Sequence, residues 1–115
     1  MPTFTKEKII NICTSIIEAA GVSHQNANLI ADLLAEANIT GHDSHGIIRI
    51  PQYLAAIEDN DILTNSDVDI LRETPLTAIV DGNWGFGQIT MNRAVEIGLE
   101  KASKSGLAAI TVRNA

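Results

Sequence analysis

The sequence has few aromatic residues, one cysteine and no strongly basic segment. Only 3% of its 115 residues are aromatic while 45% are hydrophobic, so a core must consist mainly of Ile, Leu, Val and Ala. Because 14 acidic residues outnumber 8 Lys and Arg, the formal net charge is -6, which disfavours binding to nucleic-acid phosphates. A chain of this length and apolar content can form one ordinary domain and is not expected to be disordered.

Features of secreted and membrane proteins are also absent from the sequence. The single cysteine, Cys13, cannot form a disulfide within the chain, which fits a reducing compartment. The first seven residues contain a proline and charges where a signal peptide would be apolar, and no apolar run is long enough to span a bilayer. We therefore expect a cytoplasmic protein with no membrane partner.

Three helices are predicted in the first half of the chain. Apolar residues recur at helical spacing in two stretches that each end before a glycine, and Ser23 is placed to cap the second stretch. A third helix begins near Arg49 or Ile50, because Pro51 is tolerated only in a first turn. The expected apolar positions are Ile9, Cys13, Ile16, Ile17 and Ala20, then Ala27, Ile30, Leu34 and Ala37, then Ile47, Ile50, Leu54 and Ile57.

After residue 60 the pattern changes to short extended segments. Residues 68–72 and 76–80 predict an antiparallel pair of strands. A glycine-rich segment then leads into a helix that ends at Gly106, and residues 107–112 predict a buried strand. Because this strand runs to the last residues given, either the chain is a fragment or the strand lies at the edge of its sheet. The expected apolar face of this last helix is Met91, Ala94, Val95, Gly98, Leu99 and Ala102.

The order of these elements predicts an α+β fold. A helical hairpin and a third helix are followed by a mixed strand–strand–helix–strand unit, which differs from the doubly wound nucleotide-binding (Rossmann) arrangement. We assign residues 1–60 to a helical N-terminal subdomain. Residues 61–115 are then expected to be the start of a second, mixed α/β domain that is cut short.

The densest group of chemically active side chains lies in residues 42–53. It comprises His42, Asp43, Ser44, His45, Arg49 and Tyr53. A histidine can exchange a proton near neutral pH, and a nearby arginine offers a planar fork to a carboxylate. Judged by residue types alone, a polar loop with a capping serine, a surface histidine and a packed tyrosine is the commoner explanation. The segment does not fit a Ser–His–Asp hydrolase, and His42 and His45 lack further ligands for a metal ion, so we predict no metal site.

A second candidate is the glycine-rich segment 82–88, which precedes a predicted helix. Glycines allow a ligand to approach the backbone closely, and a helix N-terminus attracts a phosphate or carboxylate. The spacing matches neither the dinucleotide fingerprint nor a P-loop. A simple turn that buries Trp84 is the more economical interpretation of the composition.

The string Ser44-His45-Gly46 followed by Arg49, Pro51 and Tyr53 resembles the characteristic segment of the type-2 malate/L-lactate dehydrogenase family. That family includes ureidoglycolate and sulfolactate dehydrogenases and cyclic imine reductases. Residues 35–38, 81–83, 87–88 and 112–115 also resemble the family, so the resemblance covers essentially the whole chain as an N-terminal portion.

This resemblance implies hydride transfer between NAD or NADP and a small 2-hydroxy or 2-oxo acid. His45 would be the catalytic acid and base with Ser44 assisting it, while Arg49, Tyr53 and Gln88 would bind the substrate. His45 and Gly87 are the candidates for contact with the cofactor.

The resemblance also implies a homodimer and further substrate and nicotinamide contacts beyond the length of this chain. The alternative function is a non-catalytic remnant that dimerises or binds a small acid, and a phosphate-binding module ranks third. The residues do not select among malate, lactate, an ureido acid and an imine, or between the two cofactors.

Overall fold

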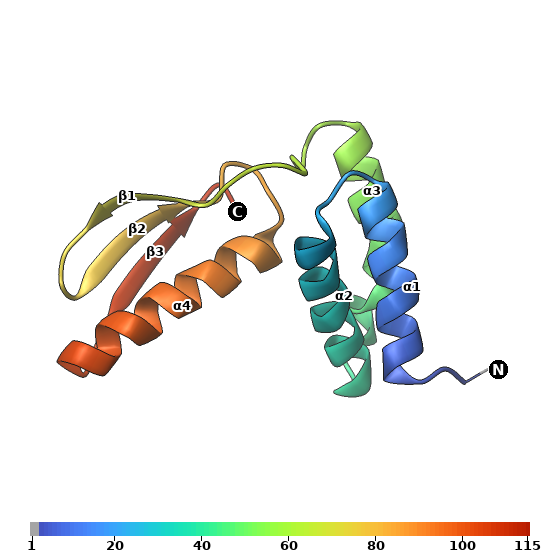
Figure 1. Ribbon diagram of the computed structural model, residues 1–115, viewed down its shortest axis with the longest axis horizontal. Helices are drawn as coiled ribbons and strands as arrows, with labels where there is room; N and C mark the ends of the chain where they lie inside the picture. Colours follow the sequence, from blue (N-terminus) through green and yellow to red (C-terminus); the bar gives the residue numbers. More distant parts are fainter. Residues whose placement is uncertain (1–2) are drawn as a thin grey trace. The chain divides into compact units, whose positions relative to one another are not determined.

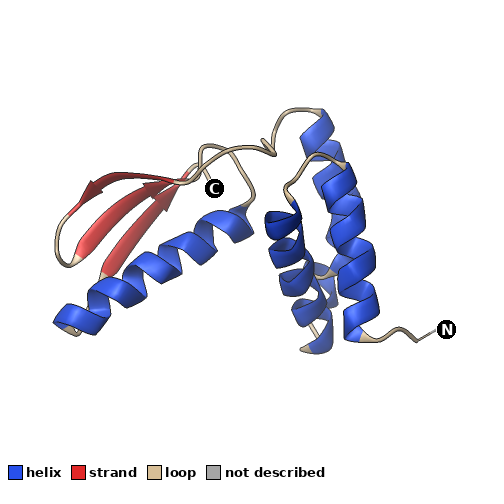
Figure 2. Cartoon of the chain, in the orientation of Figure 1, coloured by secondary structure: helices blue, strands red, loops and turns tan. Residues whose placement is uncertain are grey.

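The chain consists of two compact units, Met1–Asn65 and Ser66–Ala115, and the computed structural model describes residues 3–115 (Figure 1). The first unit is helical, and the second combines one long helix with a three-stranded sheet (Figure 2). The predicted α+β class is therefore confirmed.

The first unit begins with a helical hairpin formed by α1 (Lys6–Ala19) and α2 (His24–Ile39). Each helix is capped by a hydroxyl that accepts a hydrogen bond from a backbone N–H two or three residues into the helix. The Thr5 hydroxyl accepts from Lys8 at 3.2 Å, and the Ser23 hydroxyl accepts from Asn26 at 3.3 Å. The hairpin and the Ser23 cap predicted from the sequence are both present.

Small and aliphatic residues of α2 provide most of the core of this unit. The buried residues of α2 are Ala27, Ile30, Ala31, Leu34 and Ala35. They share the core with Cys13 and Ile17 of α1, and the alanines leave room for the two backbones to approach. Burial raises the pKa of the Cys13 thiol, which therefore stays protonated near neutral pH.

The segment between α2 and α3 (Ile50–Glu58) forms two short 3-10 helices where the sequence predicts an irregular loop. These are η1 (Asp43–His45) and η2 (Ile47–Arg49). Pro51 lies in the first turn of α3, so the predicted start of this helix is correct. Two members of the expected apolar faces are instead exposed, namely Ile16 at 39% and Ile47 at 38%.

The second unit contains β1 (Asp69–Glu73), β2 (Thr77–Asp81), α4 (Gly87–Ser105) and β3 (Ala109–Arg113). The strand order is β1-β2-β3, with β1 antiparallel and β3 parallel to the central β2. Figure 2 shows α4 along one face of this sheet. The core between them consists of Ala78, Val80 and Ile97, with Val68 and Ile110 packed against it.

Two predictions for the second unit are wrong in detail. First, β3 lies at an edge of the sheet, and its residues alternate between exposed and half-buried, so it is not a buried strand. Second, Met91, Val95 and Leu99 are 50%, 54% and 67% exposed. Ala94 of the predicted face is buried as expected, and α4 contacts the core of the sheet through Ile97, which the predicted face did not include. Because apolar residues surround much of α4, their spacing alone could not identify which of them are buried.

Within the described part of the chain, no helix combines the length and the apolar character needed to cross a membrane.

Leu34 and Leu33 of α2 form a matched pair for testing this core. Leu34 is 2% exposed and Leu33 is 40% exposed. Leu34→Ala should lower the free energy of unfolding by about 2–5 kcal/mol, because it leaves a cavity between α1 and α2. Leu33→Ala should cost about 1 kcal/mol or less. Urea unfolding followed by far-ultraviolet circular dichroism measures both, and equal losses would contradict this account of the core.

Candidate functional site

The candidate site lies on the turn that follows α2. Gly41 has a left-handed φ of 88°, which lets the chain leave the helix while the His42 N–H donates to the Ala37 carbonyl oxygen at 2.8 Å. The next residues wind into η1, where the His45 N–H donates to the His42 carbonyl oxygen at 2.9 Å. The backbone of the predicted catalytic residues is therefore fixed by short-range hydrogen bonds.

Within η1 the Ser44 hydroxyl contacts the imidazole of His45. Ser44 Oγ lies 3.0 Å from His45 Nδ1, a hydrogen bond whose direction depends on the imidazole tautomer. Holding Nδ1 fixes the orientation of the ring and directs Nε2 away from the serine. Both side chains are exposed, so the ring is accessible to a small molecule from solvent.

Arg49 is held by the same turn. Its Nε donates to the Ser44 carbonyl oxygen at 2.7 Å, and its Nη1 donates to Gln52 Oε1 at 2.9 Å. A guanidinium carries five N–H donors, so these two bonds orient the plane of the group without using all of its donors. Such an oriented fork is suited to a carboxylate.

Ser44 thus connects the two most important predicted residues. Its hydroxyl contacts His45 and its carbonyl accepts from Arg49, so one residue holds both the imidazole and the guanidinium. Tyr53 follows on α3, four residues after Arg49, and is half-buried. The structure therefore brings Ser44, His45 and Arg49 together, and it places Tyr53 one turn along the next helix.

The other two predicted residues, Gly87 and Gln88, belong to the second unit. They form the first turn of α4, whose N-cap residue, Phe86, makes no side-chain capping hydrogen bond. A Cβ added at Gly87 would have no heavy atom closer than 4.0 Å, so the backbone there can be approached closely. Trp84 is 58% exposed, so the alternative of a turn that buries Trp84 is wrong.

The glycine-rich segment is held in place by the carboxylate of Asp81 at the end of β2. Asp81 Oδ1 accepts from the Asn83 N–H at 2.8 Å and from Asn114 Nδ2 at 3.2 Å. Asn83 and Trp84 both have left-handed φ values, 51° and 62°, in this turn. Asp81 therefore joins the start of the glycine-rich segment to the residue that follows β3.

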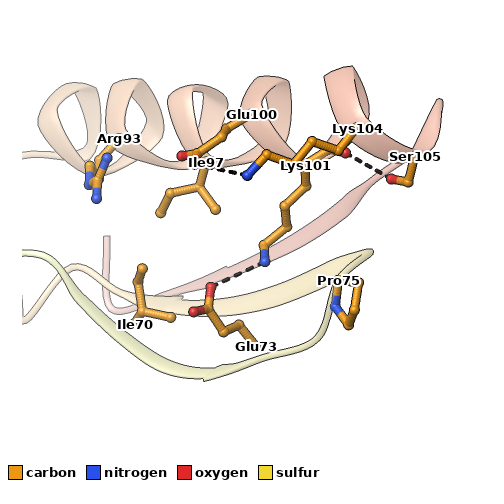
Figure 3. Close-up of a pocket in the computed structure, with 9 residues that line it drawn as sticks. All are labelled: Ile70, Glu73, Pro75, Arg93, Ile97, Glu100, Lys101, Lys104 and Ser105. Atoms are coloured by element: carbon orange, nitrogen blue, oxygen red, sulfur yellow. Dashed lines mark hydrogen bonds and ion pairs between the residues drawn. The ribbon is translucent and has the colours of Figure 1, made fainter.

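A pocket of about 600 Å³ lies in the second unit, between α4 and β1 (Figure 3). Four of its charged residues form two pairs: Lys101 Nζ lies 3.1 Å from Glu73, and Lys104 Nζ lies 3.6 Å from Glu100. The fifth, Arg93, lies 3.3 Å from Glu96, which does not line the pocket. These pairs reduce the attraction of the pocket for a free anion. None of the residues predicted from the sequence for catalysis or binding lines it.

Among the described residues, no cluster of three or more His, Cys, Asp and Glu side chains is arranged to hold a metal ion.

Two residues that organise the site were not predicted from the sequence, Gln52 and Asn38. Gln52 lies between Pro51 and Tyr53 of the resembling string, and its side-chain oxygen accepts from Arg49. Asn38 follows Ala31 and Leu34 on the buried face of α2, where the pattern calls for an apolar residue. A polar residue in an apolar stripe is a signal that sequence analysis can use, since departures from the local pattern concentrate at functional or strained positions.

Comparison with known proteins identifies the family. The sequence model of the malate/L-lactate dehydrogenase family matches residues 4–115. The L-sulfolactate dehydrogenase of Methanocaldococcus jannaschii is 35% identical over 114 residues, which cover 99% of this chain and 32% of that protein. Hydroxycarboxylate dehydrogenase B of Escherichia coli O157:H7 is 33% identical over 111 residues, which cover 96% of this chain and 31% of that protein.

A solved structure supports the same relationship. The malate dehydrogenase of Pyrococcus horikoshii OT3 superposes with a TM-score of 0.95 at 26% identity, covering 98% of this chain and 32% of that one. These relatives are dehydrogenases of 2-hydroxy acids. The chain belongs to the malate/L-lactate dehydrogenase family, and it spans about a third of the length of the curated relatives that it matches.

Gly82 and Gly87 provide a test of how the glycine-rich segment is packed. A Cβ at Gly82 would overlap the Thr90 hydroxyl and lie 2.7 Å from the Asn114 carbonyl oxygen, whereas one at Gly87 would make only an ordinary van der Waals contact at 4.0 Å. Gly82→Ala should lower the free energy of unfolding by about 1–3 kcal/mol through overpacking. Gly87→Ala should cause no loss. Chemical denaturation of the two variants measures the difference, and an equally stable Gly82→Ala would contradict the packing.

Proposed function

We propose that this chain contributes the acid–base site of an oxidoreductase that transfers a hydride between a nicotinamide cofactor and a small 2-hydroxy or 2-oxo acid. The observation that carries this proposal is the double role of Ser44, which holds His45 through its hydroxyl and Arg49 through its carbonyl. A 2-oxo acid that is reduced by hydride needs a group that exchanges a proton with the reacting oxygen and a cation that binds its carboxylate. In this proposal His45 and Arg49, on the turn after α2, supply these two groups.

His45 exchanges the proton of the reaction in this proposal. When a 2-oxo acid is reduced, the carbonyl oxygen develops negative charge and must receive a proton, and in the reverse direction the hydroxyl must lose one. The contact between Ser44 Oγ and Nδ1 directs Nε2 toward solvent-accessible space, where a substrate oxygen can lie. Ser44 then acts by holding the ring in one orientation.

Arg49 binds the substrate carboxylate in this proposal. Its guanidinium is oriented by Ser44 and Gln52 before a substrate arrives, which reduces the entropy lost on binding. We assign Tyr53 and Gln88 to the substrate as well, on the basis of the family resemblance. Malate, lactate and sulfolactate share the 2-hydroxy acid group that these contacts would recognise, so the substrate class is proposed at that level.

The cofactor in this proposal is NAD or NADP, which supplies or accepts the hydride. The first turn of α4 fits part of such a cofactor, because Gly87 carries no side chain and backbone N–H groups at a helix N-terminus suit a polar or anionic group. The family resemblance assigns Gly87 and His45 to contacts with the cofactor. Residues 61–115 are accordingly proposed as the start of the substrate- and cofactor-binding domain, and the homodimer and the cytoplasmic location stay predictions.

His45→Asn tests the acid–base role. Oxidation of NADH and NADPH by the chain with a panel of 2-oxo acids is followed by absorbance, and the variant should lose on the order of 10²–10⁴-fold in turnover. His24→Asn is the matched control, because His24 is an exposed histidine at the start of α2. Normal turnover by His45→Asn would refute the role. A folded wild-type chain without turnover would indicate that the site needs the further substrate and nicotinamide contacts that the family resemblance implies.

Arg49→Lys tests the carboxylate contact. Lysine keeps the charge but loses the planar fork and the two bonds that orient it, so KM for acid substrates should rise on the order of tenfold while kcat changes less. Arg72→Lys on the exposed strand β1 is the control. An unchanged KM in steady-state kinetics would remove Arg49 from the substrate site.

A further inference from the structure

The side chain of Asn38 bridges the two short helices that carry the candidate site. Its Oδ1 accepts from the Ile47 N–H at 2.9 Å, at the start of η2, and its Nδ2 donates to Asp43 Oδ1 at 2.9 Å, at the start of η1. Ser44 and His45 lie between these two attachment points. Asn38 itself is half-buried in the last turn of α2, so its backbone is held by a helix packed on the core.

The chemistry of these two bonds requires a primary amide. An N–H must find an acceptor and a carboxylate must find a donor, and among short side chains only asparagine supplies both from one planar group. The same network determines which way the amide points. In the opposite orientation the amide NH₂ would face the Ile47 N–H, and the amide oxygen would face the Asp43 carboxylate. Neither an aliphatic residue nor an aspartate at position 38 could make both bonds.

Gly46 confirms how closely the amide fits the turn. Gly46 is buried, and a Cβ added there would overlap the Oδ1, Cγ and Nδ2 atoms of Asn38. The amide therefore occupies the space that any other residue at position 46 would need. The glycine and the asparagine together define the path of the backbone between η1 and η2.

We propose that Asn38 is a positioning residue, which holds η1 and η2 in the conformation that sets His45 against Ser44 and Arg49 against the Ser44 carbonyl. The catalytic consequence rests on the function proposed above, while the structural consequence does not. Releasing the amide frees both ends of the turn at once, and the Ser44–His45 and Ser44–Arg49 contacts should loosen together.

A charge-swapped pair of substitutions tests this role in the full chain. Asn38→Asp keeps an acceptor for the Ile47 N–H but sets a second carboxylate against Asp43, so the turn should open. In the double variant Asn38→Asp/Asp43→Asn, the amide at position 43 donates to the carboxylate at position 38, so the bond between these residues is restored with donor and acceptor exchanged. The carboxylate at position 38 still accepts from the Ile47 N–H. Asn28→Asp is the control, because it makes the same chemical change at an exposed position of the same helix.

The primary readout is the nitrogen NMR spectrum of the His45 imidazole, which reports the tautomer and the hydrogen bond at Nδ1. Asn38→Asp should shift the His45 signals toward those of a free imidazole, the double variant should return them to the wild-type positions, and Asn28→Asp should leave them unchanged. Wild-type signals in Asn38→Asp would overturn the proposal. A double variant whose His45 signals match those of Asn38→Asp would also overturn it.

Turnover provides a second readout that separates this proposal from the proposed function. If the chain reduces 2-oxo acids, Asn38→Asp should lower kcat on the order of 10²-fold, as expected for a misplaced catalytic group, and the double variant should recover it. His45 signals that shift in Asn38→Asp and return in the double variant, together with turnover that is unchanged in His45→Asn, would contradict the proposed function alone. Turnover that is lost in His45→Asn but unchanged in Asn38→Asp would contradict the positioning role alone.

Discussion

The packing of α2 against α1 is the interaction on which the first unit depends. The buried face of α2 supplies most of the core, and the same helix ends in the residue that holds the candidate site. The site therefore takes its geometry from a rigid element, although it lies on an exposed turn. This arrangement allows an accessible histidine and arginine to be held in defined positions without burying either polar group, which would be costly.

In the second unit the glycine-rich segment is held by a residue at the end of a strand. A single carboxylate, Asp81 at the end of β2, holds the glycine-rich segment and the residue after β3. The left-handed residues Asn83 and Trp84 are sterically unfavourable, and hydrogen bonds such as that from the Trp84 N–H to the Asn114 carbonyl oxygen stabilise them. In both units a short polar side chain fixes a turn, and the turn carries the residues that the family resemblance assigns to function.

Much of the fold could be predicted from the sequence, because the helices and strands are set by local patterns. The hairpin, the Ser23 cap, the start of α3 at Pro51 and the antiparallel β1–β2 pair all follow from such patterns. The burial of β3 and of the apolar residues of α4 could not be predicted, since burial depends on which surface another element covers. Strand β3 has a neighbour on one side only among the described residues.

The structure brings together three of the predicted site residues, Ser44, His45 and Arg49, by contacts that the sequence did not reveal. His45 and Arg49 stand out by residue type and by the family resemblance, and the structure brings them together through Ser44. The link itself depends on the 3-10 geometry of η1 and η2, which periodicity does not reveal. Asn38 lies in the resembling segment 35–38, but it was assigned no role because its bonds to η1 and η2 depend on the turn that follows α2.

The different connectivity of the two units has a consequence for the order in which they fold. Helix α1 pairs with α2, its neighbour along the chain, so the hairpin forms by closing one short loop. The parallel pairing of Thr77 with Ala109 joins two strands that are separated in the sequence by the whole of α4, and such non-local contacts form slowly. We therefore expect the His45 turn to acquire its native shape early, while the sheet that carries the glycine-rich segment is the slow step.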